Sequence, residues 1–252
     1  MYFINKFLER LTRFCKYLMT EKYKQNHKYQ NKNQTVNTNF ILKSLHDKNY
    51  KPNYIVDVGC GHGEWTKKMM KYFYKSNFLL FDANEDNKEK LEELKNKNNN
   101  ISYKITLLSD DNKDYKFYKM GYGSSIYEEQ TSHKRKVQNI KSIRLIDVLP
   151  EELKKSKNNM IKLDVQGAEL KILNGLNELI NKFEIIILET SLHGYNKNAP
   201  LFNEVLNFMI NKNYKLYDLF DFKRLGNYKS FLLQFDCVFV REDSELTKVK
   251  FE

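Results

Sequence analysis

The hydrophobic positions of the chain follow two alternating periods. Compact apolar runs, such as residues 54–58 and 78–81, have the length and the β-branched or aromatic content of buried strands. Between such runs, apolar residues recur three and four positions apart, as in residues 64–74 and 86–96, which is typical of amphipathic helices. Strands that alternate with helices in this way predict a parallel sheet.

The same pattern continues to the end of the chain. Further strands are predicted at residues 101–109, 115–118, 143–148, 160–165 and 185–189, with helices at 39–46, 167–181 and 201–213. The last two strands, 214–220 and 235–241, lack a full crossover helix between them, so we expect an antiparallel hairpin. The predicted fold class is α/β, with a doubly wound, mostly parallel sheet of about seven strands and an antiparallel C-terminal strand.

Residues 1–20 form a different kind of segment. Apolar side chains lie there at helical spacing with charges on the other face, which predicts an amphipathic helix. Charges interrupt each apolar stretch, which argues against a signal peptide, and no run reaches the about 18 apolar residues of a membrane span. Residues 21–39 are polar, so we expect an N-terminal extension at 1–37 and a single domain at 38–252. The helix is expected to dock on the chain's own core or in a homodimer, or to make a weak peripheral membrane contact.

Composition adds a basic charge to this picture. The 252 residues include 43 Lys+Arg against 32 Asp+Glu, and a net charge of +11 would normally suggest nucleic acid or an anionic membrane as partner. The cations are interleaved with acids, and no zinc-finger, RNP or helix-turn-helix pattern accompanies them, so we predict no nucleic-acid partner. Cys15, Cys60 and Cys237 are odd in number and lack metal-ligand spacing, which predicts reduced thiols in a cytoplasmic protein.

The most informative segment is YIVDVGCGHGEW, residues 54–65. A buried strand carrying Asp57 runs into a turn, where Gly59 and Gly61 allow close approach of the backbone to a ligand. A dinucleotide fold needs a third glycine three residues after the second, and Glu64 stands there, which disfavours a dehydrogenase. Asp57 would repel phosphates but suits the ammonium of an amino-acid group.

Acidic residues also end the next two strands. Asp82 lies about 21 residues past Gly61, where an acid can accept hydrogen bonds from both ribose hydroxyls of an adenosine. Ser109 and Asp110 end the third run, within reach of the adenine amino group. Each acid alone could instead cap a helix or turn. Their order on successive strand ends favours a nucleoside site.

At this point the residues resemble a known family. VDVGCGHGEW followed by FDAN is similar to the S-adenosylmethionine site of class I methyltransferases, which implies that Ala83 and Asn84 join Asp82 in binding that cofactor. NMIKLDVQGAELKILNGL, residues 159–176, resembles the signature stretch of FkbM-type methyltransferases, and the resemblance extends from about residue 54 to residue 241. The resemblance implies methylation of hydroxyl groups, commonly of sugars or related metabolites.

Two positions depart from the pattern of that family. The family usually carries Glu where this chain has Gln166, and Glu-Pro where it has Asp82-Ala83. The second change keeps the acid and shortens its side chain by one methylene. The first removes a negative charge from the signature stretch.

The signature strand supplies the first candidate for acceptor chemistry. Lys162 and Asp164 point to the same face of the strand, and Asp164 lies at its carboxyl end, where open α/β sheets bind ligands. Its alternative role is a cap for the helix after Gly167. Glu169 is a candidate substrate-binding residue that forms an ion pair with Lys162, either to orient Asp164 or as a purely structural bridge.

Further candidates follow the next strand and fill the insertion at residues 113–139. Glu189 ends the strand, and His193 four residues later is either a general base or an inert loop histidine. We predict no metal, because no compact carboxylate cluster stands in the sequence. The insertion either builds the acceptor pocket or forms an ordinary edge hairpin. Its candidate substrate-binding residues are Tyr122, Ser124, Ser125 and Tyr127.

The sequence therefore predicts a methyltransferase that uses S-adenosylmethionine. We expect O-methylation of a saccharide or nucleotide-linked sugar in capsule or other surface-polysaccharide biosynthesis, with alignment of the reacting atoms supplying most of the acceleration. One alternative is transfer to a nitrogen or a phosphoryl-linked group. A second is an RNA methyltransferase, which the charge favours but which lacks the Asn/Asp-Pro-Pro-Tyr signature. A third is a non-catalytic protein that binds the cofactor.

Overall fold

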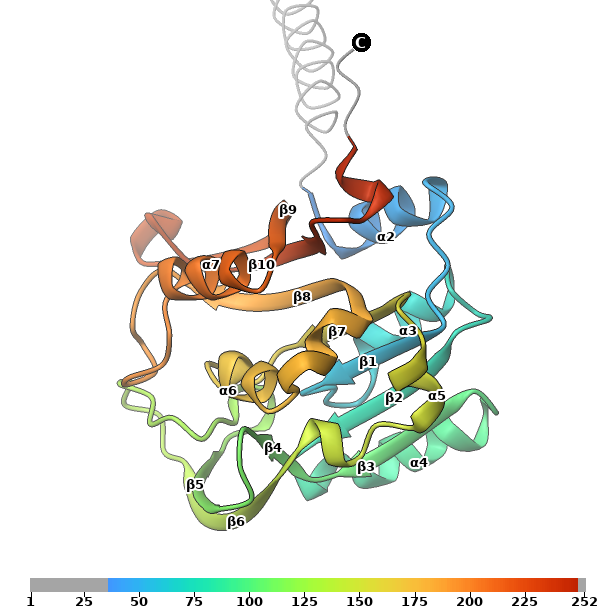
Figure 1. The fold of residues 1–252 in the computed structure, drawn as a ribbon. Coiled ribbons are helices and arrows are strands. Elements are labelled where there is room, and N and C mark those ends of the chain that lie inside the picture. The colour runs from blue at the N-terminus through green and yellow to red at the C-terminus, as the bar shows by residue number, and fades with distance from the viewer. Residues whose placement is uncertain (1–35, 249–252) are drawn as a thin grey trace, which may run out of the picture. The chain divides into compact units, whose positions relative to one another are not determined.

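The computed structural model describes residues 36–248 (Figure 1). The N-terminal helix predicted at residues 1–20 lies outside the described residues. The chain divides into the units Met1–Asn37 and Thr38–Glu252, and every element named below belongs to the second unit.

A seven-stranded sheet forms the centre of this unit, in the order β3-β2-β1-β7-β8-β10-β9. The strands are β1 (Tyr54–Val58), β2 (Asn77–Asp82), β3 (Ile101–Ile105), β7 (Asn159–Leu163), β8 (Phe183–Ser191), β9 (Tyr214–Leu225) and β10 (Phe231–Arg241). The strands from β3 to β8 in that order pair in parallel, whereas β10 is antiparallel to both of its neighbours. This arrangement confirms the predicted mostly parallel sheet and its antiparallel C-terminal hairpin.

Helices cover both faces of the sheet, as a doubly wound fold requires (Figure 1). They are α2 (Thr38–Asp47), α3 (Glu64–Met70), α4 (Lys88–Asn96), α5 (Glu151–Lys155), α6 (Glu169–Asn174) and α7 (Phe202–Asn211). On one face, Leu153 of α5, Ile172 of α6 and Met209 of α7 join a core cluster with Ile161 of the central strand β7. The central strands β1, β7 and β8 are therefore buried on both sides, which explains their continuous apolar runs.

A second, three-stranded sheet corrects two predicted strands. It consists of β4 (Leu107–Ser109), β6 (Lys136–Arg144) and β5 (Asp114–Lys119), in that order. The run predicted as one strand at 101–109 divides at Thr106, whose N–H donates to Asp82 O at 2.7 Å, after which Leu107 pairs with Ser142. The strand predicted at 143–148 instead runs from Lys136 to Arg144, because its first part pairs with β5 in the preceding insertion, and residues 145–147 form a 3₁₀ helix.

Two predicted helices are shorter than expected. The helix predicted at 64–74 ends at Met70. The helix predicted at 167–181 divides into α6 and a 3₁₀ helix, Asn177–Lys182. Gly175 stands at the division, where a Cβ atom would lie 2.6 Å from Ser109 O, so only glycine lets the chain pass this closely. Cys60 and Cys237 are buried free thiols, and Cys15 lies outside the described residues.

The central position of β7 leads to a stability prediction. Ile161 is fully buried, whereas Ile210 on α7 is 54% exposed. We expect Ile161→Ala to lower the free energy of unfolding by about 2–5 kcal/mol, because it leaves a cavity in the core. The matched Ile210→Ala should change it by less than about 0.5 kcal/mol. Denaturant titration measures both values, and equal losses would contradict the assigned packing.

Candidate active site

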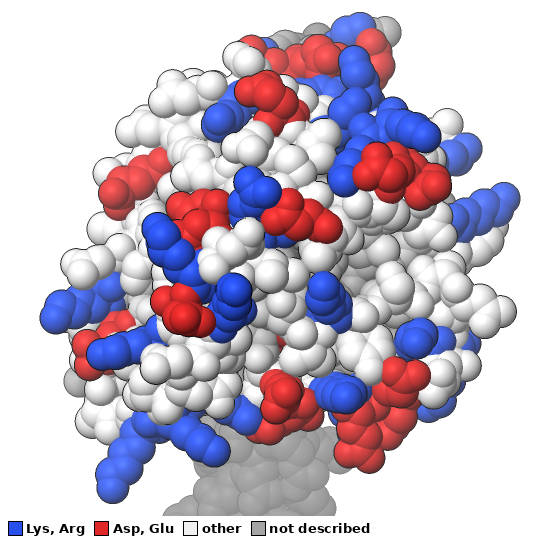
Figure 2. Space-filling view, turned by 60° about the horizontal axis from the view of Figure 1, so that its bottom comes forward, with Lys and Arg blue, Asp and Glu red and all other residues white. Residues whose placement is uncertain are grey.

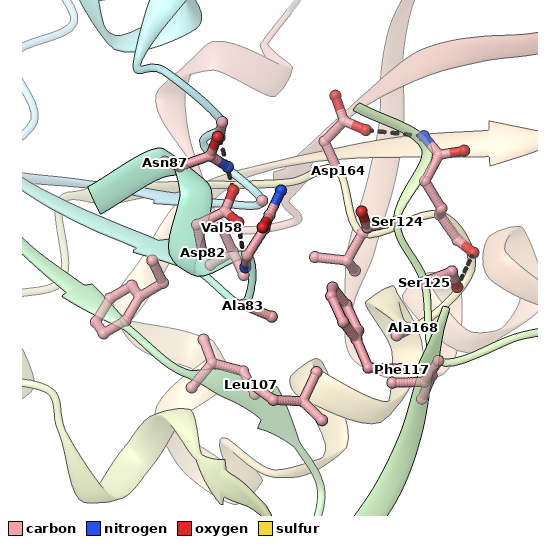
Figure 3. A pocket seen from close by; sticks show the side chains of 18 of the residues that line it. Val58, Asp82, Ala83, Asn87, Leu107, Phe117, Ser124, Ser125, Asp164 and Ala168 are labelled. Carbon is pink, nitrogen blue, oxygen red and sulfur yellow. Dashed lines mark hydrogen bonds between the residues drawn. The ribbon is translucent and has the colours of Figure 1, made fainter. Parts of the chain in front are cut away.

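A cavity of about 470 Å³ opens beyond the carboxyl ends of β1, β2 and β7 (Figure 3). The strand order reverses between β1 and β7, and such a switch point is where open α/β sheets bind ligands. The volume lies within the range of small-molecule sites. The fold therefore provides one well-formed pocket where the sequence placed its motifs.

The glycine turn after β1 forms one edge of this cavity. Gly59 has a φ of 75° and donates its N–H to Phe81 O at 2.8 Å. A Cβ atom at this position would lie 2.0 Å from Asp164 O, so no side chain fits between the two turns. The absence of a side chain at Gly59 is what brings the ends of β1 and β7 together.

Asp82 is held in one orientation at the end of β2. Its carboxylate accepts the N–H groups of Gly61 and Asn84, each at 2.8 Å, and the side chain of Asn87 (Figure 3). Burial raises the pKa of Asp82, and these donors oppose that shift. A carboxylate has about four lone-pair sites, so Asp82 can still accept hydrogen bonds from a ligand in the cavity.

Apolar side chains line the cavity next to Asp82. They include Ala83, Leu107, Leu108, Phe117 and Ile172. Of these, only Ala83 was predicted to belong to the site. Leu107 and Leu108 were not, because in an apolar strand they have the same pattern as ordinary core residues. A flat apolar ligand group such as an adenine ring can pack on this surface.

The predicted neighbours Ser109 and Asp110 are not brought to the cavity. Ser109 is buried and donates to Asp110 Oδ1 at 3.0 Å, and Asp110 pairs with Lys171 at 3.3 Å. The division of the strand at Thr106 is the physical reason, because Thr106 and the two leucines after it line the cavity instead.

Asp57 lies beneath the glycine turn and is not among the residues that line the cavity. Its Oδ2 accepts the hydroxyl of Thr66 at 2.6 Å, while the buried Oδ1 has no hydrogen-bond partner within residues 36–248. Burial raises the pKa of Asp57 to about 6. The unsatisfied Oδ1 leaves room for a donor that comes with a ligand or a water molecule.

Asp164 stands on the side of the cavity opposite Asp82 (Figure 3). Lys162 Nζ lies 2.8 Å from Asp164 Oδ2, and the Gln166 side-chain amide donates to Oδ1 at 3.2 Å. Burial alone would raise the pKa of Asp164, but the charge of Lys162 outweighs it and holds the pKa below its usual range. Asp164 is therefore ionised at neutral pH.

The expected ion pair between Lys162 and Glu169 is wrong. Lys162 pairs with Asp164, and Glu169 Oε1 accepts the backbone N–H groups of Val165 and Gly167, both at 3.1 Å. Glu169 therefore fixes the turn that carries Asp164. The sequence could have indicated this contact, because Glu169 lies at the start of α6, where a carboxylate can accept hydrogen bonds from free backbone N–H groups.

A buried polar network continues behind Gln166. The Gln166 amide donates to Glu189, and Glu189 also accepts Lys223 Nζ and the Gln234 amide. Gln234 donates to Tyr195 Oη at 2.7 Å, and Tyr195 donates to Gln166 Oε1. Burial, reinforced by the charge of Asp164, raises the pKa of Glu189. Lys223, Tyr195 and Gln234 were not predicted, because isolated polar residues on the antiparallel C-terminal strands and on a loop carry no sequence signal.

The insertion places only part of its candidate residues at the cavity. Ser124 and Ser125 line it, and Ser125 Oγ donates to Gln166 O at 2.9 Å (Figure 3). Tyr127 packs on Gly167 outside the lining residues. The side chain of Tyr122 lies outside what the structure describes.

His193 is not among the residues lining this cavity. Its ring lies 5.3 Å from that of Phe231, measured between centroids, and it lines a separate small cavity with Glu189 and Tyr195. The structure therefore separates His193 from Asp164 by the buried polar network.

Comparison with known families identifies the chain. A sequence model of a protein family, described as the methyltransferase FkbM domain, matches residues 57–216. These residues include the glycine turn, Asp82, Asp164 and Glu189. The chain belongs to the FkbM methyltransferase family. It is thus a methyltransferase that uses S-adenosylmethionine as its methyl donor.

Comparison with solved structures gives distant likenesses. A SAM-dependent methyltransferase from Aquifex aeolicus is 15% identical, with a TM-score of 0.44 over 81% of this chain and 89% of that one. An S-adenosylmethionine-dependent methyltransferase from Clostridium acetobutylicum is 10% identical, with a TM-score of 0.46 over 81% and 90%. The precorrin-6y C5,15-methyltransferase of Geobacter metallireducens is 9% identical, with a TM-score of 0.43 over 76% and 81%. Comparison with curated proteins gives no match.

The residues of this FkbM methyltransferase fit S-adenosylmethionine. Asp82 offers a fixed carboxylate next to an apolar wall, which matches a ribose joined to adenine. The glycine turn admits no side chain at Gly59, and Asp57 retains an unsatisfied buried oxygen below it. At the other end of the cavity lies Asp164, together with Gln166 and Lys223 of the polar network.

Asp82 leads to a binding prediction. We expect Asp82→Ala to weaken the binding of S-adenosylmethionine and of its demethylated product by about 1–3 kcal/mol, because charge-assisted hydrogen bonds are lost. Asp114→Ala, at an exposed position on β5, should bind as the wild type does. Calorimetric titration measures both affinities. Unchanged affinity in a folded Asp82→Ala variant would contradict the assigned ribose site.

Glu169 leads to a prediction about pH. Burial raises its pKa from 4.5 to about 7, so the folded carboxyl holds its proton more tightly than the unfolded one. The free energy of unfolding should therefore fall as pH rises from about 4.5 to about 7, by up to about 3 kcal/mol from this group. Glu169→Gln keeps an oxygen for both N–H groups and should flatten that slope.

The matched control is Glu178→Gln, because Glu178 is exposed in the 3₁₀ helix that follows α6. Denaturant titrations at several pH values measure the slope for each variant. The Glu178 variant should keep the wild-type slope. An unchanged slope in Glu169→Gln would show that the pKa of Glu169 is not raised.

Proposed function

We propose that residues 38–252 transfer a methyl group from S-adenosylmethionine to a hydroxyl group of a saccharide or nucleotide-linked sugar. The observation that carries the proposal is a pair of fixed carboxylates, Asp82 and Asp164, on opposite sides of one cavity (Figure 3). One side suits a nucleoside, and the other suits a hydroxyl group. The family resemblance supports a place in capsule or other surface-polysaccharide biosynthesis.

The nucleoside half of the cavity assigns roles to the residues after β2. Asp82 accepts the ribose hydroxyls, and Ala83 with Leu107 and Phe117 forms the wall for the adenine. Asn84 lines the same part of the cavity, and its Oδ1 accepts the N–H of Asp86 at 3.1 Å and so holds the turn. The backbone at Gly59 and Gly61 borders the remainder of the cofactor.

The acceptor half assigns the chemistry to Asp164. When bound, S-adenosylmethionine would supply a methyl group on a sulfonium, and the neutral thioether of its demethylated product would be the leaving group. Asp164 accepts a hydrogen bond from the acceptor hydroxyl and so aligns its oxygen for an in-line attack. Ser124 lines the same part of the cavity, where its hydroxyl can bind a polar acceptor.

Asp164 can also receive the proton that leaves the acceptor. Lys162 keeps the pKa of Asp164 low, so this carboxylate is a weak base toward a free hydroxyl group. The hydroxyl proton becomes much more acidic as its oxygen gains the methyl group, and a weak base then suffices. Lys162 acts as a positioning residue, since its contact at Oδ2 leaves Oδ1 facing Gln166 and the cavity.

Gln166 explains how this chain tolerates two neighbouring carboxylates. Its side-chain amide donates to Asp164 and to Glu189, which a glutamate at this position could not do when ionised. Lys223 forms an ion pair with Glu189 and so compensates the negative charge of that carboxylate. The departure from the usual family residue is therefore consistent with an active methyltransferase.

The charges at the cavity favour a small acceptor over RNA. Asp82, Asp86 and Asp164 line it, whereas the lining residue Lys223 is already paired with Glu189. An acidic lining repels the phosphates of RNA and, equally, those of a nucleotide-linked sugar, so among the proposed acceptors it favours a saccharide without phosphate groups, and it suits a cationic cofactor. Figure 2 shows basic and acidic side chains interspersed over one face of the molecule, so the net charge of +11 is not gathered into a basic patch on that face.

Asp164 leads to a kinetic prediction. We expect Asp164→Asn to lower kcat by about 10²–10⁴-fold, because it removes both the charge and the proton acceptor. The affinity for S-adenosylmethionine should stay close to that of the wild type. Steady-state kinetics with a screened saccharide acceptor and calorimetry measure the two effects.

The matched control is Asp147→Asn, because Asp147 is a surface acid paired with Arg144. It should leave kcat unchanged. Wild-type kcat in Asp164→Asn would remove Asp164 from the mechanism. Turnover on RNA with a steep salt dependence, together with none on saccharides, would favour the RNA methyltransferase over the proposed function.

A further inference from the structure

The β9–β10 hairpin extends past the network and exposes a cluster of apolar side chains. We call residues 222–231 the hairpin tip. Phe222, Leu225 and Phe231 are 47%, 52% and 41% exposed, and Tyr228 is fully exposed. Leu225 and Phe231 are cross-strand partners, so two of these side chains stand side by side. Soluble proteins rarely gather apolar side chains at a projecting position unless something covers them.

The loop after β8 extends the same apolar surface. Leu192 is exposed and its N–H donates to Leu233 O at 2.9 Å, which fixes this loop along β10. The ring of His193 lies 5.3 Å from that of Phe231. Two segments far apart in sequence therefore contribute to one surface.

The charges of the hairpin tip are of one sign. Lys223, Arg224 and Lys229 lie within it, and no acid occurs from residue 222 to residue 235. Elsewhere the chain mixes the two signs, with 43 basic against 32 acidic residues overall. Lys223 is paired with Glu189, so Arg224 and Lys229 are the cations that can meet lipid headgroups. Cations interleaved with aromatic and aliphatic side chains match the surface of an anionic bilayer, where apolar groups enter the interface.

The hairpin tip lies beside the acceptor end of the cavity. Lys223 lines the cavity and pairs with Glu189, while its neighbours Phe222 and Arg224 are exposed. Figure 1 shows the tip at the end of the sheet where β8 has its carboxyl end. A surface that covers the tip would therefore lie next to the place where the acceptor enters.

We propose that the hairpin tip binds the surface of an anionic lipid bilayer, which places the acceptor end of the cavity at the membrane. The contact is peripheral, since no helix within residues 36–248 is long and apolar enough to cross a bilayer. A protein groove is a poorer match, because the tip is a projecting hairpin with cations among its apolar side chains. The proposal concerns the surface alone and holds whichever atom of the acceptor is methylated.

The test uses the full chain and a reporter at the tip. Tyr228→Trp adds a tryptophan at a fully exposed position, and wild type carries only Trp65. With vesicles of phosphatidylglycerol and brominated phosphatidylcholine, we expect fluorescence quenching of the tryptophan at position 228 and none of Trp65. The position of the quenched reporter distinguishes the tip from the predicted N-terminal helix, which can bind vesicles by itself.

A second pair of variants measures the contribution of the tip. The double variant Leu225→Ser, Phe231→Ser should reduce partitioning onto these vesicles by at least about tenfold, because two apolar side chains no longer enter the interface. The matched control replaces Ile210 and Leu216, which are exposed on α7 and near the start of β9, by serine and should partition as the wild type does. Retained binding of S-adenosylmethionine shows that each variant is folded.

Three results would overturn the proposal. Vesicle binding without quenching at position 228 would assign the membrane contact to another segment. Wild-type partitioning of the double tip variant would do the same. Self-association of the chain that the double variant abolishes, without lipid quenching, would make the tip a protein interface. None of these readouts depends on acceptor turnover, so they remain separate from the test of O-methylation.

Discussion

A buried cation in the central strand determines how the acceptor end of the site is built. Lys162 is 5% exposed, and its neighbours include the carboxylates of Asp164, Asp57 and Asp236. Burial alone would lower the pKa of Lys162, but the negative charges of these carboxylates have the larger effect and raise it. A buried charge is tolerated only when it is paired, and Asp164 provides the direct partner of Lys162 at 2.8 Å. Removing Lys162 would leave these three acids close together without the cation that contacts Asp164 directly, and Lys223 would be the remaining cation that acts on Asp164 and Asp236.

The same arrangement separates two roles among neighbouring acids. Asp164 touches Lys162 directly and stays ionised at the cavity, whereas Asp236 and Glu189 lie deeper and have raised pKa values because of burial. Gln166 connects Asp164 with Glu189 without adding a charge. The site therefore exposes the carboxylate of Asp164 to the acceptor, whereas Asp236 and Glu189 stay buried beside it. Such a network is stabilising only while every member keeps its partner.

The sequence predicts the fold, and it places the glycine turn and Asp82 next to one cavity, for identifiable reasons. Buried parallel strands leave continuous apolar runs, and the glycine turn and Asp82 lie at fixed separations along one βαβ unit.

Leu107 and Phe117 were missed because a ligand-facing apolar side chain has the same pattern as a core residue. Lys223 and Gln234 reach the network from the antiparallel strands β9 and β10, more than thirty residues after Glu189, and only tertiary packing reveals their contacts. The Lys162–Glu169 pair failed because backbone N–H groups competed for the glutamate.

The central claim is that one cavity holds the nucleoside at Asp82 and presents the reacting end of the cofactor to Asp164. A crystal structure of the chain with S-adenosylhomocysteine tests it most directly. The account predicts ribose hydroxyls on the Asp82 carboxylate, the adenine against Ala83 and Leu107, and the sulfur facing Asp164. A nucleoside bound elsewhere, or a sulfur turned away from Asp164, would contradict it.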